Sequence, residues 1–226
     1  MLISTDQGPA GWSRPIRLTD ARIFFAVPPA ARDAVTSLWA LDRRFGDQLR
    51  ATREPALAQI RLRWWRDALD QLESHGPVAD PLLAQLRQGW PDAAVLIALA
   101  DVWDDWLCCE QDAVAAGQIA AQRGELLFAA TARTQLGPAQ ARAGSGACWS
   151  LVDLALGCGD AAVARALLDR AAATPIAGSA QYGSALAMLD QWAQRVARRS
   201  GAAAPLRDSA RLFVCGLAAS VRPESR

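Results

Sequence analysis

Two charged side chains fall where helical spacing otherwise places apolar residues. Asp42 lies inside the apolar stripe of a predicted helix over 30–51, and Arg61 lies near the middle of the stripe of a predicted helix over 55–74. A buried arginine keeps its proton and needs an anion, and a buried aspartate has the matching need. The stripes consist of Ala34, Val35, Leu38, Leu41, Phe45 and Leu49 in the first helix and of Leu57, Ile60, Trp64, Trp65, Ala68 and Leu72 in the second.

Two interpretations of this pair are open. In the first, Asp42 and Arg61 satisfy one another, or satisfy helix-end backbone, inside the core. In the second, Arg61 lines a cavity and binds an anionic ligand such as a diphosphate, because a guanidinium holds phosphate oxygens in a bidentate manner. Spacing alone favours the first interpretation.

Further acids stand on two other predicted helices. Asp101, Asp104 and Asp105 lie within about one and a half helical turns and could hold Mg²⁺. The buried stripe of that helix, however, runs through Val102, and Asp101 and Asp104 point away from it, which favours a solvated acidic face. Asp153 is the one acid in the apolar segment 147–156, and we expect it to be hydrogen-bonded in the core or at its rim.

Composition excludes several classes of chemistry. The single histidine, His75, lies in a Gly/Pro turn, which excludes a Ser/His/Asp triad and a Cys/His zinc site. Lysine is absent, so no Schiff base can form. A net charge of +1 provides no basic field for nucleic acid, and no apolar run is long enough to span a membrane. With no secretory signal visible, we expect a cytoplasmic protein, and peripheral association with the inner membrane remains open.

Helical periodicity recurs along the chain, and strand patterns are almost missing. Short connections make consecutive helices antiparallel neighbours. The fold class expected is an all-α, single-domain antiparallel bundle over 18–220, with a flexible N-terminal segment 1–17 and a tail 221–226. The predicted helices cover 18–26, 30–51, 55–74, 80–88, 92–110, 112–136, 139–157, 160–173, 179–200 and 204–219.

The segment from Ala21 to Leu72 resembles the N-terminal part of the squalene/phytoene synthase family. The residues that carry the resemblance are Ala21-Arg22-Ile23-Phe24-Phe25-Ala26-Val27-Pro28, Ala30-Ala31-Arg32-Asp33-Ala34, Leu38-Trp39-Ala40-Leu41-Asp42-Arg43 and Ile60-Arg61-Leu62-Arg63-Trp64-Trp65-Arg66-Asp67-Ala68-Leu69. Glu54-Pro55-Ala56-Leu57 and the tryptophan pair are similar to a divergent branch that includes complex I assembly factors. A weaker resemblance continues through Arg123-Gly124 and the Trp149–Leu156 helix.

The resemblance implies an isoprenoid synthase fold. Active members of the family join two prenyl diphosphates head to head, with Mg²⁺ held by two Asp-rich motifs on facing helices. Where the first motif would place its aspartates, this sequence has Gly46 and Arg50, and only the neighbouring acid Asp47 is kept. Arg50 puts a positive charge where a metal would bind, and no full acid pattern appears around Asp153.

The resemblance also supplies candidate site residues. Asp42, Asp47 and Asp153 are the candidate catalytic acids, with Asp47 and Asp153 as weak candidates for a Mg²⁺ site if the protein is active. The candidate diphosphate-binding residues are Arg43, Arg50 and Arg61. The candidate cavity-wall residues are Phe25, Trp39, Trp64 and Trp149.

Three functions follow from these expectations. The favoured one is a non-catalytic protein that binds an isoprenoid or lipid-like ligand, or a protein partner in the assembly of a respiratory complex. The first alternative is an active prenyltransferase, which requires Asp42 or Asp47 to face Asp153 across one water-accessible cavity. The second alternative is a helical scaffold without a ligand, which requires Trp64, Trp65, Trp103 and Trp149 to be tightly packed.

Overall fold

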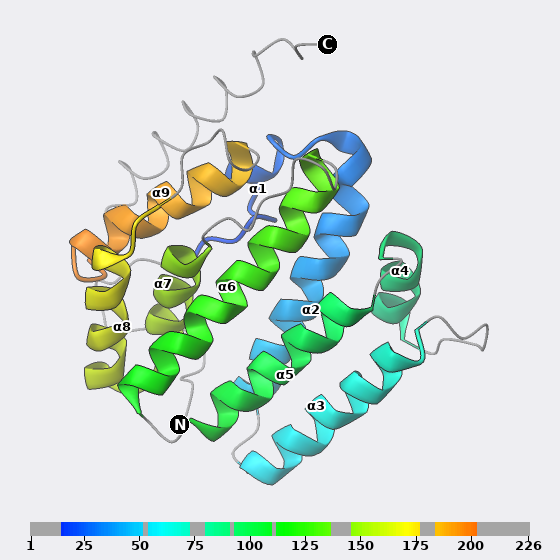
Figure 1. Ribbon diagram of the computed structural model, residues 1–226, viewed down its shortest axis with the longest axis horizontal. Coiled ribbons are helices and arrows are strands. Elements are labelled where there is room, and N and C mark those ends of the chain that lie inside the picture. The colour runs from blue at the N-terminus through cyan, green and yellow to red at the C-terminus, as the bar shows by residue number, and fades with distance from the viewer. Residues whose placement is uncertain are drawn as a thin grey trace.

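The computed structural model describes residues 15–51, 54–72, 80–90, 93–109, 112–136, 146–176 and 184–202. All regular structure in these ranges is helical, which confirms the all-α prediction (Figure 1). The helices are α1 (Ala21–Phe24), the 3₁₀ turn η1 (Pro29–Ala31), α2 (Arg32–Ala51), α3 (Pro55–Asp70), α4 (Pro81–Gly89), α5 (Ala94–Cys108), α6 (Ala113–Leu136), α7 (Ala147–Gly157), α8 (Ala161–Ala173) and α9 (Ser184–Arg198).

Local signals explain where several helices begin. Asp80 accepts a hydrogen bond from the backbone N–H of Leu82, and Asp160 accepts from those of Ala162 and Val163, so each caps the helix that follows. Pro55 and Pro81 occupy first-turn positions, where the missing N–H has no helical partner to lose. Several predictions lie outside the described residues: the helix over 204–219, the first part of the helix over 139–157, the turn at His75, residues 1–14 of the N-terminal segment and the tail 221–226.

The helices pack as two groups that meet along α6. On one side, α3 packs against α5 and α5 packs against α6; α2 contacts α3, α4, α5 and α6 (Figure 1). On the other side, α7 packs against α6, α8 and α9. Every residue of α7 from Ala147 to Leu156 is buried, so this helix is the centre of its group. α3 lies at the outer edge of the first group.

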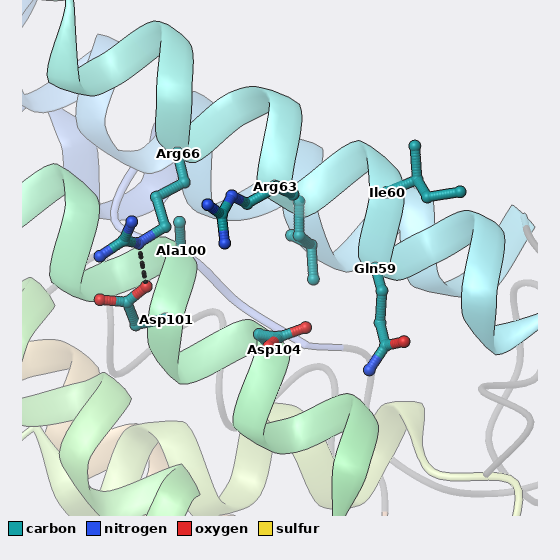
Figure 2. Close-up of a pocket in the computed structure, with 8 residues that line it drawn as sticks. Gln59, Ile60, Arg63, Arg66, Ala100, Asp101 and Asp104 are labelled. Atoms are coloured by element: carbon teal, nitrogen blue, oxygen red, sulfur yellow. Dashed lines mark hydrogen bonds and ion pairs between the residues drawn. The ribbon is translucent and has the colours of Figure 1, made fainter.

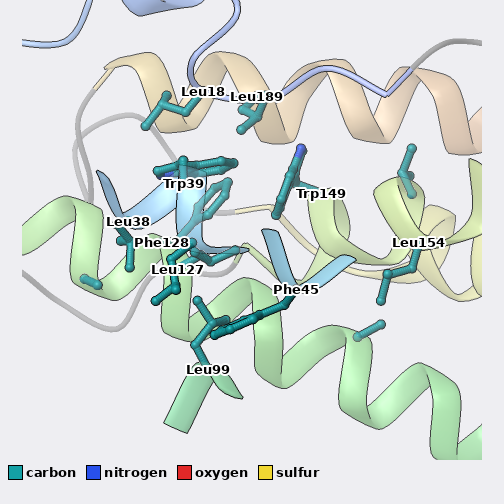
Figure 3. Packing of buried hydrophobic residues seen from close by; sticks show 14 of the residues in the cluster. Leu18, Leu38, Trp39, Phe45, Leu99, Leu127, Phe128, Trp149, Leu154 and Leu189 are labelled. Carbon is teal, nitrogen blue, oxygen red and sulfur yellow. The ribbon is translucent and has the colours of Figure 1, made fainter. Parts of the chain in front are cut away.

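Aromatic rings fill the junction between the two groups. The ring of Trp39 on α2 lies 4.8 Å from that of Trp149 on α7 and 6.3 Å from that of Phe128 on α6, measured between centroids (Figure 3). Trp39 Nε1 donates to Thr131 Oγ1 at 3.0 Å, so its one polar atom is satisfied in the core. These contacts bring α2, α6 and α7 together beside the charged groups described below.

The apolar residues Ile16 and Leu18, which precede α1, belong to this core. Ile16 is buried, and its carbonyl oxygen accepts a hydrogen bond from Trp149 Nε1 at 2.8 Å. Arg17 follows it and extends toward α7. None of the described helices combines the length and apolar content needed to cross a bilayer.

Candidate functional site

A buried ion pair joins α2 to α6. The guanidinium of Arg123 donates from Nε to Oδ1 of Asp42 at 2.8 Å and from Nη2 to Oδ2 at 2.6 Å. Arg123 is 1% exposed and Asp42 is fully buried. This is the bidentate geometry in which an arginine and a carboxylate interact most strongly. The burial predicted for Asp42 is confirmed, and its partner is Arg123.

α7 supplies the second half of the site. Arg123 Nη2 also donates to Oδ2 of Asp153 at 2.9 Å, and Nη1 donates to the hydroxyl of Ser150 at 3.0 Å. Ser150 and Asp153 are both buried. Since a guanidinium has five N–H donors in a planar fork, these four bonds use all of them but one. Asp42 and Asp153 therefore converge on one cation from two different helices.

Two tryptophans enclose the guanidinium. The Arg123 Cζ atom lies 4.8 Å from the ring centroid of Trp103 on α5 and 4.9 Å from that of Trp149, which is cation–π distance. Trp103 Nε1 donates to Asp42 Oδ1 at 2.9 Å, so the tryptophan also binds the carboxylate. The charged centre is thereby closed by aromatic rings on the α5 and α7 sides.

A second arginine approaches Asp153 from outside the bundle. Arg17 Nε lies 3.6 Å from Asp153 Oδ1, and the Arg17 side chain is 17% exposed. Burial by itself disfavours the charged form of Asp153, but Arg17, Arg123 and Arg50 outweigh it and hold the pKa of Asp153 below its usual range. Asp42 and Asp153 are thus balanced by the cations Arg17 and Arg123. We call Arg17, Asp42, Trp103, Arg123, Ser150 and Asp153 the ionic centre.

The ionic centre does not fit a magnesium ion. A metal needs the free oxygens of several carboxylates, whereas the oxygens of Asp42 and one oxygen of Asp153 already accept hydrogen bonds from a cation held between them. No group of three or more His, Cys, Asp or Glu residues suited to a metal occurs among the described residues. The geometry required for the active enzyme, two acids across a water-accessible cavity, is replaced by two acids across a guanidinium.

Gly46 contributes to this closure. A Cβ atom added at Gly46 would lie 3.1 Å from the Cη2 atom of Trp103, tighter than ordinary van der Waals contact. The small residue leaves room for the indole to lie against α2 and reach Asp42. The position at which the family resemblance expects an aspartate is therefore filled by the ring of Trp103.

The other candidate residues on α2 lie at the surface. Asp47 is half exposed and accepts from Arg50 at 2.6 Å and from Arg43 at 3.4 Å. The side chain of Arg43 is 69% exposed, while that of Arg50 is mostly covered. Asp47 is thus an ion-pair partner on the outer side of α2, and it does not join Asp42 and Asp153 around Arg123.

The expected burial of Arg61 is wrong. Arg61 is exposed, and the buried stripe of α3 runs through Ala58, Leu62, Trp65 and Leu69. Two apolar stripes at helical spacing occur on α3, and the bundle covers the one that excludes Arg61. The Asp42–Arg61 pairing is therefore replaced by the Asp42–Arg123 pair.

The four candidate cavity-wall residues do not enclose one space. Trp39 and Trp149 pack against each other in the core, while Phe25 is 37% and Trp64 54% exposed. Ring packing fills the volume that the first two were expected to line. Trp65 and Trp103 are buried as a tightly packed scaffold requires, but the exposure of Trp64 departs from that expectation.

An open groove lies between α3 and α5, away from the ionic centre. Its volume is about 590 Å³. Arg63 and Arg66 of α3 and Asp101 and Asp104 of α5 line it, and Arg66 Nε donates to Asp101 Oδ1 at 2.8 Å (Figure 2). Asp101 and Asp105 are exposed, in agreement with the predicted acidic face, and Asp104 is half-buried.

Sequence reasoning missed the central residue of the site. Arg123 lies on the buried stripe of α6 with Ala116, Ala120 and Leu127, at the same helical spacing that singled out Asp42. That pattern could have identified Arg123 as a buried cation, but not its partners on α2 and α7.

Comparisons of the chain with protein-family models, with curated proteins and with solved structures find no match. The function is therefore argued from the geometry of the ionic centre and of the surface around it.

Proposed function

We propose that this protein is a non-catalytic helical binding protein of the squalene/phytoene synthase type, and that it acts by docking a protein partner. One observation carries the proposal: the guanidinium of Arg123 fills the point on which Asp42 and Asp153 converge. A condensing enzyme needs a metal cluster on these carboxylates, and the buried guanidinium occupies the position that the metal would take.

Displacing Arg123 to admit a metal is costly. Asp42 and Asp153 would be left buried without their cation, and removing one partner of a buried ion pair typically costs about 3–5 kcal/mol. Since 1.4 kcal/mol is a factor of ten, the open state would be populated at about one part in a hundred to one in several thousand. A guanidinium is also a weaker electrophile than Mg²⁺, so it does not replace the metal in ionising a diphosphate.

A binding role agrees with the exposed surface. Leu57, Ile60 and Trp64 are large apolar side chains on α3 that the bundle leaves in solvent. Such groups on a well-packed helical protein indicate a contact surface for another molecule. A role in assembling a larger complex, as the resemblance to complex I assembly factors suggests, is one form of this function.

One observation favours the alternative of an active prenyltransferase. Asp42 and Asp153 approach one point from facing helices, which is the arrangement a two-motif metal site would start from. This alternative requires Arg123 to leave the centre when diphosphate and metal bind.

A turnover assay distinguishes the non-catalytic binding protein from the active prenyltransferase. Radiolabelled farnesyl and geranylgeranyl diphosphate are incubated with the full chain and Mg²⁺ or Mn²⁺, with and without NADPH, beside an Asp42→Asn variant. We expect no condensed product from either protein. Product formed by the natural sequence and lost in Asp42→Asn would overturn the proposal, because it would mean that the acids bind metal despite Arg123.

A further inference from the structure

One face of α3 carries three large apolar side chains that the described helices leave exposed, and the exposed Arg61 lies beside them. Leu57 is 45% exposed, Ile60 65% and Trp64 54%. Their spacing of three and four residues places them on one side of the helix, next to the side that packs on α5. The ring of Trp64 meets the ring of the buried Trp65 edge-on, with 5.2 Å between the centroids, and this contact restrains the Trp64 side chain.

The groove between α3 and α5 borders this face. Ile60 belongs to both, and Leu62 and Ala100 provide apolar surface within the groove. Figure 2 shows side chains from α3 and α5 turned toward the space between the two helices. An apolar stripe therefore continues into a recess whose opposite wall is formed by carboxylates.

The charges around the groove do not cancel. Arg66 is engaged by Asp101, and Arg63 lies 3.3 Å from Asp67 on its own helix. None of the ion pairs among the described residues includes Asp104. Partial burial, and then the like charges of Asp105 and Asp101, raise the pKa of the Asp104 carboxyl. The recess therefore holds a carboxylate whose charge is uncompensated and would be stabilised by a cation.

We propose that α3 and the α3–α5 groove form a docking site for a cationic amphipathic helix of a partner protein. The apolar side of that helix covers Leu57, Ile60 and Trp64, and a lysine or arginine beside it enters the groove against Asp104. The site rests on the proposed binding function and gives its partner a chemical class. α3 has 16 residues, which is about 24 Å of helix, enough to seat roughly four turns of a partner.

Charge argues against two other kinds of occupant for this face, an anionic membrane surface and a second copy of this chain. Arg61 beside the apolar stripe would attract an anionic bilayer, but the three acids Asp101, Asp104 and Asp105 at the edge of the stripe would repel it. In a symmetric dimer the same patch faces itself, which would bring the two Asp104 carboxylates together without added cations. A cationic helix satisfies both the apolar stripe and the acid.

The test uses a displayed library of helical peptides and the full chain. Apolar residues are fixed at positions i, i+3, i+4 and i+7, and the flanking positions are varied among Lys, Glu and Ala. Selected peptides are then titrated by fluorescence anisotropy against the natural sequence and three variants. Trp64→Ser and Asp104→Asn alter the proposed site, and Val114→Ser is the matched control, because Val114 is 63% exposed on α6.

We expect lysine-containing peptides to be enriched and glutamate-containing ones to be depleted. Trp64→Ser should weaken their binding at least tenfold, and Asp104→Asn at least threefold with a smaller dependence on salt. Val114→Ser should leave the affinity unchanged, and circular dichroism should show that all three variants keep their helix content.

Four outcomes would overturn the inference. They are the absence of enriched peptides, binding that survives both site variants, binding of phosphatidylglycerol vesicles that depends on Trp64, and a dimer in sedimentation that Trp64→Ser dissolves. None of these changes the result of the prenyl diphosphate assay, so failure of the docking site is distinguishable from failure of the non-catalytic assignment.

Discussion

Arg123 and Asp42 are 81 residues apart in the sequence and are joined by two hydrogen bonds in the core. Their contact fixes α6 against α2, and the bonds from Arg123 to Ser150 and Asp153 fix α7 against both. Burial opposes the charge of Arg123, but Asp42 and Asp153 raise the pKa of its guanidinium above the ordinary value. The arginine is therefore a cation at every pH at which the protein is folded.

Replacing the central cation should destabilise the protein strongly. Arg123→Met leaves Asp42 buried without a cation and Asp153 with Arg17 as its one remaining cation among the described residues, and we expect the free energy of unfolding to fall by about 3–5 kcal/mol. Urea unfolding followed by tryptophan fluorescence measures the loss. Arg43→Met is the matched control, since Arg43 pairs with Asp47 at the surface and should change stability by about 0.5 kcal/mol or less. Equal losses in the two variants would contradict the structure.

Asp153 should make stability depend on pH in acid. Its pKa is lowered in the folded state, so the native protein binds fewer protons than the unfolded chain. Its contribution is complete above the unfolded pKa of about 3.9 and is lost as the pH falls through the folded value. We expect the stability difference between the natural sequence and Asp153→Asn to be largest near pH 7 and to narrow below about pH 4. A difference that stays constant between pH 7 and pH 3 would contradict this.

Restoring an acid at position 46 should not create an enzyme. In Gly46→Asp the new side chain meets the ring of Trp103, and the ring must shift away from position 46, which disturbs its hydrogen bond to Asp42. We expect a loss of about 1–3 kcal/mol in unfolding free energy and no condensation of prenyl diphosphates. Mg²⁺-dependent product from this variant would mean that Gly46, and not Arg123, is what disables the site.

The close approach of α6 to α7 predicts an unequal pair of glycine substitutions. A Cβ atom at Gly124 would overlap the carbonyl oxygen of Gly146, which is backbone and cannot move aside. Gly124→Ala should therefore cost about 2 kcal/mol or more. At Gly117 the added atom meets only the flexible side chain of Arg170, and Gly117→Ala should be neutral or stabilising by up to about 1 kcal/mol. Thermal unfolding of the two variants checks the difference.

Adjacent tryptophans on α3 should respond differently to truncation. Trp65 is buried, with its ring edge-on to that of Phe45 at 5.9 Å, and Trp65→Ala should lower stability by about 3–5 kcal/mol. Trp64→Ala removes an exposed ring and should cost about 1 kcal/mol or less. Urea unfolding measures the loss of unfolding free energy in both variants. A larger loss for Trp64→Ala than for Trp65→Ala would mean that α3 packs on the bundle through the opposite face.

Periodicity predicted the elements better than the contacts between them. The helical class, helix starts at or within one residue of the observed ones at Pro55 and Pro81, and the burial of Asp42 were all predictable from local sequence. The orientation of α3 was not predictable, because Leu57, Ile60 and Trp64 form one stripe at helical spacing and Ala58, Leu62 and Trp65 form another. Which stripe is covered depends on the place of α3 at the edge of the bundle, and that is a tertiary property.

The partner of Asp42 could not be predicted from the local sequence either. Arg61 and Arg123 each occupy a position in an apolar stripe, and only the packing of α6 against α2 decides between them. Helical spacing over 113–136 places Arg123 in an apolar stripe, just as the spacing of α2 places Asp42 in one. The encounter of these two charges with Asp153 could not have been derived, because it joins three segments far apart in the chain.

The ionic centre also sets the order in which the chain can mature during synthesis. The ribosome releases Asp42 long before Arg123, and Asp153 follows 30 residues after Arg123. Until Arg123 on α6 has emerged, the carboxylate of Asp42 has no cation to enter the core with, and burying it alone would be unfavourable. Asp42 must therefore stay in contact with water while α2 is the only partner of the pair that has been synthesised. The final packing of the bundle follows the synthesis of Arg123 and is a late event in folding.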